Sequence, residues 1–119
     1  MSNKWVWFNI GQKGLSGVTW QSAVIKDNFD PSTIKFEDWE WDNNGEPTEK
    51  WVSKEELSYS FHKSVAMCFK DLNKVAEWIK TTYETGQEQY VGYNNWTYIY
   101  NVFDMDNVNE YGVAKGLWD

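Results

Sequence analysis

Apolar residues recur at helical spacing between residues 71 and 86, and this is the clearest structural pattern in the chain. Positions separated by three, four, seven and eleven residues lie on one side of a helix. The side chains in these positions are Leu72, Val75, Ala76, Ile79 and Tyr83. Asp71 suits an N-cap because its carboxylate accepts from first-turn N–H groups, and Gly86 readily adopts the left-handed conformation that ends a helix. The pattern predicts an amphipathic helix over about residues 71–85.

Short runs rich in aromatic and β-branched residues, which favour strands, lie on both sides of this helix. They cover residues 4–10, 18–25, 35–41, 50–52, 89–93 and 96–103. In the first run, Val6, Phe8 and Ile10 share one face, whereas Trp5 and Trp7 share the other. A strand with two apolar faces is covered on both, or covered on one and used for contact on the other. The last run also has two apolar faces, so we expect it in the middle of the sheet.

Turn signals join these elements into one fold. Residues 42–47 (Asp-Asn-Asn-Gly-Glu-Pro) favour a tight turn, which predicts a hairpin between the third and fourth runs. Asn94-Asn95 suits a second reversal. The resulting fold class is α+β: a single domain over residues 1–119, in which a single antiparallel or mixed sheet of aromatic-rich strands is packed by one main amphipathic helix.

The segment between the hairpin and the helix does not indicate a single kind of secondary structure. Ser53 and Glu56 match a capping box, which predicts a short helix. Residues 57–69 then fit helical and strand spacing equally well. We expect a helical turn followed by a strand near residues 65–69.

Nine tryptophans among 119 residues change the picture of the surface. Tryptophan is rarely fully buried, and a domain of this size cannot place nine indoles in its interior. Some indoles are therefore expected at the surface, where a large apolar ring with a polar N–H group favours contact with a partner.

The charge indicates the kind of partner. The net charge is −7, and all 11 cationic residues are lysine. Recognition of phosphates and base edges depends strongly on the planar guanidinium group, so the absence of arginine argues against direct nucleic-acid binding. An acidic protein is better suited to a basic protein partner.

The cysteine content and the N-terminus indicate where in the cell the protein is expected. Cys68 is the only cysteine, which excludes an intrachain disulfide. The N-terminus lacks the basic segment followed by an apolar segment that is typical of a signal peptide, and no apolar run approaches the length of a membrane span. We expect a cytoplasmic protein without a membrane partner.

Common catalytic and metal-binding arrangements are poorly represented. His62 is the only histidine, and it has no nucleophile signature beside it. One cysteine and one histidine do not supply the usual four ligands of a transition metal. We therefore expect a protein without enzymatic activity, catalytic residues, a metal or a cofactor.

The acidic residues are concentrated in one quarter of the chain. Residues 27–56 hold ten of the 18 acids and three of the 11 lysines, a net charge of −7, and the other 89 residues carry eight of each. One interpretation is a solvated hairpin whose indoles point inward. The other is a binding face, in which the acids steer a cationic partner and the indoles anchor it. The residues expected to bind the partner are Glu37, Asp38, Trp39, Glu40, Trp41, Asp42, Glu46, Glu49 and Trp51.

Residues 69–79 (Phe-Lys-Asp-Leu-Asn-Lys-Val-Ala-Glu-Trp-Ile), which follow short aromatic strands, resemble a helix start in some bacterial immunity proteins of contact-dependent growth-inhibition systems. The resemblance implies a small, acidic, cytosolic protein that binds one cognate toxin. Members of that family share no catalytic residues, so the resemblance implies none in this sequence. The expected function is therefore a protein inhibitor of a basic partner such as a nuclease toxin.

Three alternatives remain open. A phage-encoded antagonist of restriction or CRISPR defence could use a local carboxylate surface in place of DNA phosphates. A carbohydrate-binding or small-ligand module could stack sugars on aromatic residues, the candidates being Tyr90, Tyr93, Trp96, Tyr98 and Tyr100. A structural subunit would assemble with itself, so the oligomeric state stays open.

Overall fold

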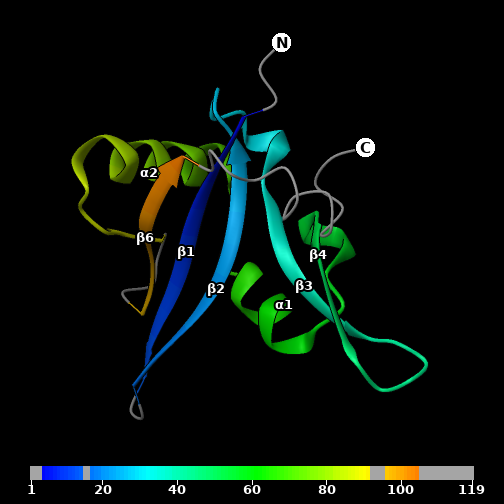
Figure 1. The fold of residues 1–119 in the computed structure, drawn as a ribbon. Coiled ribbons are helices and arrows are strands. Elements are labelled where there is room, and N and C mark those ends of the chain that lie inside the picture. Colours follow the sequence, from blue (N-terminus) through cyan, green and yellow to red (C-terminus); the bar gives the residue numbers. More distant parts are fainter. Residues whose placement is uncertain (1–3, 15–16, 92–95, 105–119) are drawn as a thin grey trace.

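The computed structural model describes residues 4–14, 17–91 and 96–104, which form one sheet of six antiparallel strands with two helices on one side (Figure 1). The strands are β1 (Trp5–Gly14), β2 (Gly17–Lys26), β3 (Lys35–Trp41), β4 (Pro47–Val52), β5 (Gln89–Tyr90) and β6 (Thr97–Asp104). The α-helices are α1 (Ser60–Ala66) and α2 (Leu72–Thr85), and the segments Pro31–Thr33 and Lys54–Glu56 form short 3-10 helices. The spatial order of the strands is β4-β3-β2-β1-β6-β5. The predicted α+β class with a single sheet is confirmed, and every strand pair is antiparallel.

Helix α2 is the amphipathic helix predicted from the sequence. The Asp71 carboxylate accepts from the backbone N–H groups of Asn73 and Lys74 at 3.1 and 3.4 Å. At the other end, Gly86 has a φ of 73°, which is the left-handed conformation expected of a terminating glycine. The helix therefore begins and ends where its capping residues require.

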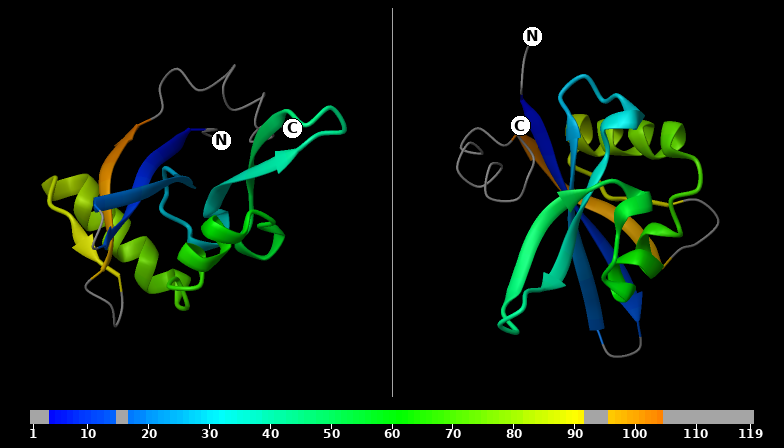
Figure 2. Two further views of the ribbon diagram at one scale, coloured as in Figure 1. Left: turned by 90° about the horizontal axis from the view of Figure 1, so that it is seen from below. Right: turned by 90° about the vertical axis from the view of Figure 1, so that its right-hand side faces the viewer.

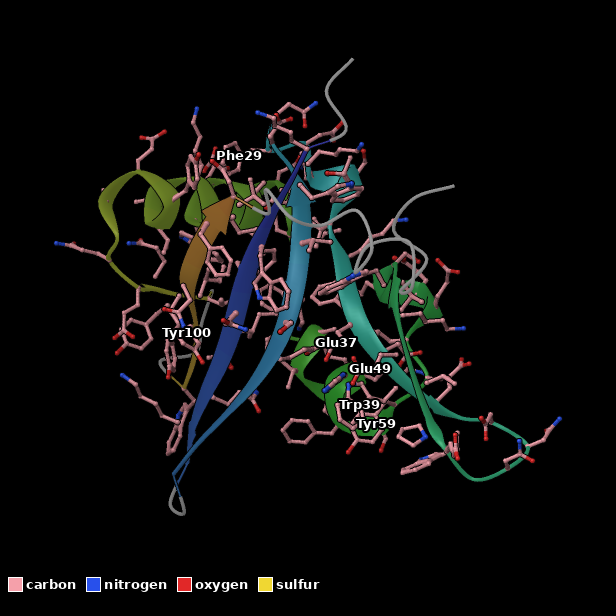
Figure 3. The ribbon with its side chains drawn as sticks, viewed as in Figure 1. Phe29, Glu37, Trp39, Glu49, Tyr59 and Tyr100 are labelled. Carbon is pink, nitrogen blue, oxygen red and sulfur yellow. The ribbon has the colours of Figure 1, made fainter. Side chains whose placement is uncertain are left out.

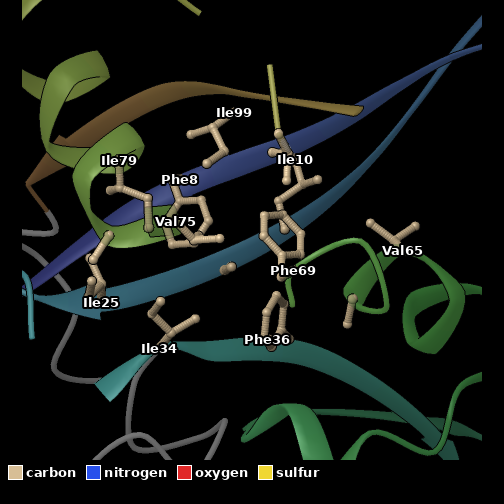
Figure 4. Packing of buried hydrophobic residues seen from close by; sticks show 14 of the residues in the cluster. Phe8, Ile10, Ile25, Ile34, Phe36, Val65, Phe69, Val75, Ile79 and Ile99 are labelled. Carbon is tan, nitrogen blue, oxygen red and sulfur yellow. The ribbon is translucent and has the colours of Figure 1, made fainter. Parts of the chain in front are cut away.

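The hydrophobic core lies between the helices and one face of the sheet. Val75 and Ile79 of α2 lie beside Phe8 of β1, and Ile10 of β1 lies beside Phe69 (Figure 4). The rings of Phe36 and Phe69 lie 5.7 Å apart and extend the core toward β3. Burial of these apolar side chains is the main stabilising contribution to the fold.

Within the described residues, the opposite face of the sheet carries aromatic side chains and no helix. Figure 2 shows that α1 and α2 lie on the same side of the strands. On the other face, the ring of Trp7 lies 5.7 Å from that of Trp51 and 6.0 Å from that of Phe103. Lys26 Nζ lies 4.7 Å from the centroid of the Trp5 ring. Aromatic and lysine side chains thus cover this face of β1.

Two expectations about the elements are wrong. Residues 65–69 do not form a strand, because α1 continues to Ala66 and Val65 and Ala66 are buried in the core. Strand β6 lies between β1 and the two-residue β5, so it is near an edge of the sheet and not in its middle. The expected reversal at Asn94-Asn95 and the C-terminal residues 105–119 lie outside the described residues.

Helix α1 lies where β3 diverges from β2 (Figure 1). These two strands pair only at Ala23–Phe36 and Val24–Lys35. Beyond that point, the carbonyl oxygen of Glu37 lies 2.7 Å from His62 Nδ1 and 3.4 Å from Gln21 Nε2. Because a carbonyl oxygen only accepts, His62 Nδ1 carries the proton in this contact. Side chains thereby replace the missing ladder bonds, and the hairpin of β3 and β4 projects away from the rest of the sheet.

Candidate protein-binding face on the β3–β4 hairpin

The register of the hairpin divides its side chains between two faces. Directly opposed residues in an antiparallel pair point to the same side. The pairs on one side are Glu37–Trp51, Trp39–Glu49 and Trp41–Pro47, and those on the other are Phe36–Val52, Asp38–Lys50 and Glu40–Thr48. We call the residues Glu37, Trp39, Trp41 and Glu49 the hairpin face.

The three candidate tryptophans differ in exposure. Trp41 is 67% exposed and Trp39 is 37% exposed. Trp51 is only 3% exposed, because its ring packs edge-on against Trp7 of β1. Trp39 and Trp41 therefore have the exposure that the binding interpretation requires, whereas Trp51 points inward, as the alternative interpretation requires.

Asp38 is buried and acts within the fold. Its carboxylate accepts from the backbone N–H groups of Ser58 and Tyr59 and from the Ser58 hydroxyl, at 2.8 to 3.2 Å. Burial on its own raises the pKa of this carboxyl, but the hydrogen bonds from Tyr59 and Ser58 outweigh it and hold the pKa below the ordinary value of 3.8. Asp38 fixes the chain that precedes α1 and does not reach a partner in this conformation.

The other acids of the hairpin lie on its reverse face and at its tip. Glu40 pairs with Lys50 at 3.1 Å, and both side chains are more than two-fifths exposed. Asp42 Oδ1 accepts from the backbone N–H groups of Asn44 and Glu46 at 2.8 and 2.9 Å, so it stabilises the turn. Glu46 is exposed beside it. The main effect of these acids is therefore to make the electrostatic potential around the hairpin face more negative, and not to contact a partner on that face.

Aromatic residues before and within α1 join Trp39, and the sequence did not identify them as part of the site. The rings of Trp39 and Tyr59 are nearly parallel, with centroids 6.3 Å apart. The His62 ring lies edge-on to Tyr59 at 4.8 Å and contacts Phe61 at 6.0 Å. We call Trp39, Tyr59, Phe61 and His62 the aromatic cluster. In the sequence, the only sign of a role for Tyr59 and Phe61 was that they are large aromatic residues in a largely polar stretch. The sequence near them does not indicate that they contact Trp39, which is some twenty positions earlier.

The aromatic cluster and the hairpin face meet at Trp39. Its indole N–H donates to Glu37 Oε1 at 3.0 Å, and Glu49 lies directly across the strand pair. Figure 3 shows Glu37, Trp39, Glu49 and Tyr59 gathered beside α1. The site therefore combines exposed aromatic rings with two carboxylates.

The tyrosines considered for carbohydrate binding gather on the opposite part of the sheet. The rings of Tyr90 and Tyr100 lie 6.0 and 5.1 Å from that of Tyr98. Lys13 Nζ lies 4.8 Å from the centroid of the Tyr98 ring and 5.1 Å from that of Tyr90, and it donates to the Tyr90 hydroxyl at 2.8 Å. Tyr98 is 6% exposed. A lysine thus occupies ring faces on which a sugar would stack. Tyr93 lies outside the described residues.

Within residues 4–14, 17–91 and 96–104, no group of three or more histidine, cysteine, aspartate or glutamate side chains could hold a metal ion. In the same part of the chain, no helix is long and apolar enough to cross a membrane. No protein-family model matches the chain, and no curated protein or solved structure matches it.

Proposed function

We propose that the protein is a non-enzymatic inhibitor that binds and neutralises a basic protein partner, such as a nuclease toxin, in the cytoplasm. One observation carries the proposal: Trp39 and Trp41 are both exposed on the same face of a projecting hairpin, where Trp39 has Glu37 beside it on the strand and Glu49 opposite it. Tryptophans at the centre of an interface often supply most of the binding free energy, because they bury large apolar rings.

The charge distribution supports a basic partner. The hairpin of residues 35–52 carries six acids and two lysines. All of these acids except the buried Asp38 are at least partly exposed on the projecting hairpin, so they raise the rate at which a cationic surface meets it. Indoles then hold the complex after the encounter.

A nucleic-acid enzyme is a fitting partner on chemical grounds. Such enzymes present lysine and arginine to the phosphate backbone, which makes their binding clefts strongly basic. An acidic hairpin of this kind would enter such a cleft and compete with the nucleic acid. An immunity protein and a phage-encoded anti-CRISPR or anti-restriction protein share this chemistry, and the identity of the partner distinguishes them.

Capture of the partner from a lysate of the native host tests the proposal. Tagged wild-type protein is compared with a Trp39→Ala/Trp41→Ala double variant and with Trp96→Ala. Trp96 is 59% exposed and lies outside the hairpin, so it is a matched control for loss of an exposed indole. We expect wild-type protein and Trp96→Ala to recover the same basic protein and the double variant to lose it.

The recovered protein is then assayed for cleavage of DNA or RNA with and without the wild-type inhibitor. Inhibition at a one-to-one ratio supports the proposal. Equal recovery of the partner by all three baits would show that the hairpin face does not bind it. Recovery of a partner whose activity is unchanged would show that the protein is not an inhibitor.

A further inference from the structure

The turn at the tip of the β3–β4 hairpin contains the only asparagine of the sequence that is followed directly by glycine, Asn44-Gly45. Asparagine is a labile residue, because the backbone nitrogen of the next residue can attack its side-chain amide carbon and close a five-membered ring. A glycine in that next position has no Cβ atom to hinder the approach. Among the asparagines of this chain, Asn44 therefore has the sequence context that most favours ring closure.

The structure leaves both residues open to solvent. Asn44 and Gly45 are exposed, and no atom beyond the chain neighbours lies within 4 Å of the place that a Cβ atom of Gly45 would take. The Asn44 side chain makes no hydrogen bond within the described part of the chain. The tip projects away from both helices (Figure 1). No neighbouring element therefore holds the Asn44 amide away from the Gly45 nitrogen or shields it from water.

Hydrogen bonds within the turn oppose the reaction. The Gly45 N–H group donates to the Asp42 carbonyl oxygen at 3.0 Å, so the attacking nitrogen is engaged in the closed turn. Asp42 Oδ1 accepts from the N–H groups of Asn44 and Glu46 at 2.8 and 2.9 Å. Because these bonds lie within the exposed residues 42–46, they can open without disturbing the core. Ring closure then proceeds from the opened turn, and the Asp42 carboxylate limits how often the turn opens.

We propose that Asn44 is a site of spontaneous modification, which converts it to aspartate and isoaspartate at a rate restrained by the Asp42 carboxylate. The Gly45 nitrogen loses its proton to the solvent and bonds to Asn44 Cγ. The Cγ–Nδ2 bond breaks, and the leaving nitrogen takes up a proton and departs as ammonia, which leaves a succinimide. Water then opens this ring: addition at Cγ gives aspartate, and addition at the main-chain carbonyl carbon of residue 44 gives isoaspartate.

Either product alters the hairpin next to Trp41. The new carboxylate adds one negative charge, which changes the net charge from −7 to −8. Isoaspartate also adds a methylene group to the backbone of the turn. The Asp42 N–H group donates to the Glu46 carbonyl oxygen at 2.9 Å across this turn, and a longer backbone disturbs that closing bond. The inference does not depend on the proposed function, since it concerns the chemistry of the turn alone.

Peptide mapping of the full chain tests the proposal. Folded wild-type protein is aged in mildly alkaline buffer and digested with trypsin, which releases residues 36–50 as one peptide. Fragment masses assign the conversion of an amide to an acid to Asn43 or Asn44, and methylation by an isoaspartyl methyltransferase detects isoaspartate. We expect conversion at Asn44 while the adjacent Asn43 is unchanged. The Asn44→Gln variant should show no conversion, because glutamine does not form the five-membered ring.

Two substitutions of Asp42 test the restraint. Asp42→Ala removes the acceptor of two N–H groups, whereas Asp42→Ser removes the same charge but keeps a side-chain oxygen that can cap the turn. We expect Asp42→Ala to accelerate conversion of Asn44 roughly threefold to tenfold, the increase in the open population that follows the loss of one or two net hydrogen bonds. Asp42→Ser should accelerate it much less. Thermal unfolding shows that each variant is folded during the incubation.

An Asn44 that stays unmodified in the folded protein, under conditions in which the urea-unfolded chain reacts, overturns the proposal. Conversion of Asn43 in place of Asn44 overturns it as well. Equal rates for Asp42→Ala and Asp42→Ser overturn the role of the Asp42 carboxylate. The inhibitor proposal is judged by partner capture with freshly prepared protein, so the failure of either proposal leaves the other unaffected.

Discussion

Asp38 is buried in the hairpin although Glu37 and Glu40, its neighbours in β3, are partly exposed. A buried carboxylate is tolerated when it accepts several hydrogen bonds, and Asp38 accepts from two backbone N–H groups and one hydroxyl. The alternation of the strand directs this side chain toward the segment before α1. A residue that resembles its acidic neighbours in the sequence therefore has a structural role.

Asp38→Asn is expected to lower the free energy of unfolding at pH 7 by about 2 kcal/mol, because hydrogen bonds to a charged acceptor are lost or weakened. Urea denaturation measures this change. Glu46→Gln removes an exposed carboxylate from the same hairpin and should change stability by less than about 0.5 kcal/mol. Equal effects of the two substitutions would contradict the structural role of Asp38.

The stabilisation from Asp38 also depends on pH. Its pKa is lower in the folded chain than the ordinary value of 3.8, so the folded state favours the ionised form. The contribution is therefore fully present above pH 3.8 and is lost as the pH falls through the folded-state pKa. The stability difference between wild-type protein and Asp38→Asn should be constant from about pH 5 to 8 and shrink in more acidic solution. A difference that grows on acidification would contradict this assignment.

Gly11 allows the close approach of Tyr98 across the β1–β6 pair. A Cβ atom at this position would lie 2.5 Å from Tyr98 Cζ, which is closer than such atoms approach. Tyr98 is held between Tyr90 and Tyr100, so it does not move without cost. Gly11→Ala should destabilise the fold by about 1–3 kcal/mol in thermal or urea unfolding.

A double-mutant cycle separates this clash from other effects of the alanine. In a Tyr98→Leu background, the added methyl group no longer meets the ring, and Gly11→Ala should cost clearly less than in the wild-type protein. Equal costs in the two backgrounds would show that Tyr98 is not the reason for glycine.

Helices α1 and α2 differ in how far local sequence specifies them. Helix α2 has a regular apolar stripe, an N-cap and a terminating glycine, and all three signals agree. Helix α1 has seven residues and no side-chain cap hydrogen bond, and its buried residues include His62. Its position depends on contacts with β3 that are distant in sequence.

Asp71→Ala should destabilise the protein by about 1 kcal/mol, since two N–H groups at the start of α2 lose their acceptor. Asp71→Ser keeps a capping oxygen and should restore most of this stability. Chemical denaturation compares the three proteins. An alanine variant as stable as the serine variant would show that the cap contributes nothing.

The charge of the whole molecule is uneven, and this affects association more than folding. The net charge of −7 arises within residues 27–56, which include the projecting hairpin. Steering by such a localised charge acts mainly on the association rate and weakens as salt screens it.

Two charge reversals of equal size test this steering. Asp42→Lys/Glu46→Lys at the hairpin tip and Glu77→Lys/Glu84→Lys on α2 each change the net charge from −7 to −3. With the captured partner at low salt, the tip variant should reduce the association rate roughly tenfold, and the α2 variant much less. Stopped-flow kinetics measures both rates. Equal reductions would mean that net charge, and not its position, controls encounter.

The sequence by itself determined the elements whose signals are local. Helix α2 and strand β3 follow from apolar spacing and strand propensity within a few residues, and the hairpin follows from its turn residues. It also determined the concentration of acids and the presence of exposed tryptophans, which composition alone requires. These features depend on interactions between residues near one another in the chain.

Only the tertiary structure decided which of the candidate residues share a surface. Trp51 is buried because β1 supplies Trp7 beside it, and Asp38 is buried because the segment before α1 supplies N–H groups. Tyr59 joins Trp39 because α1 occupies the space where β3 diverges from β2. Contacts between distant segments set these exposures, and periodicity within one segment does not contain that information.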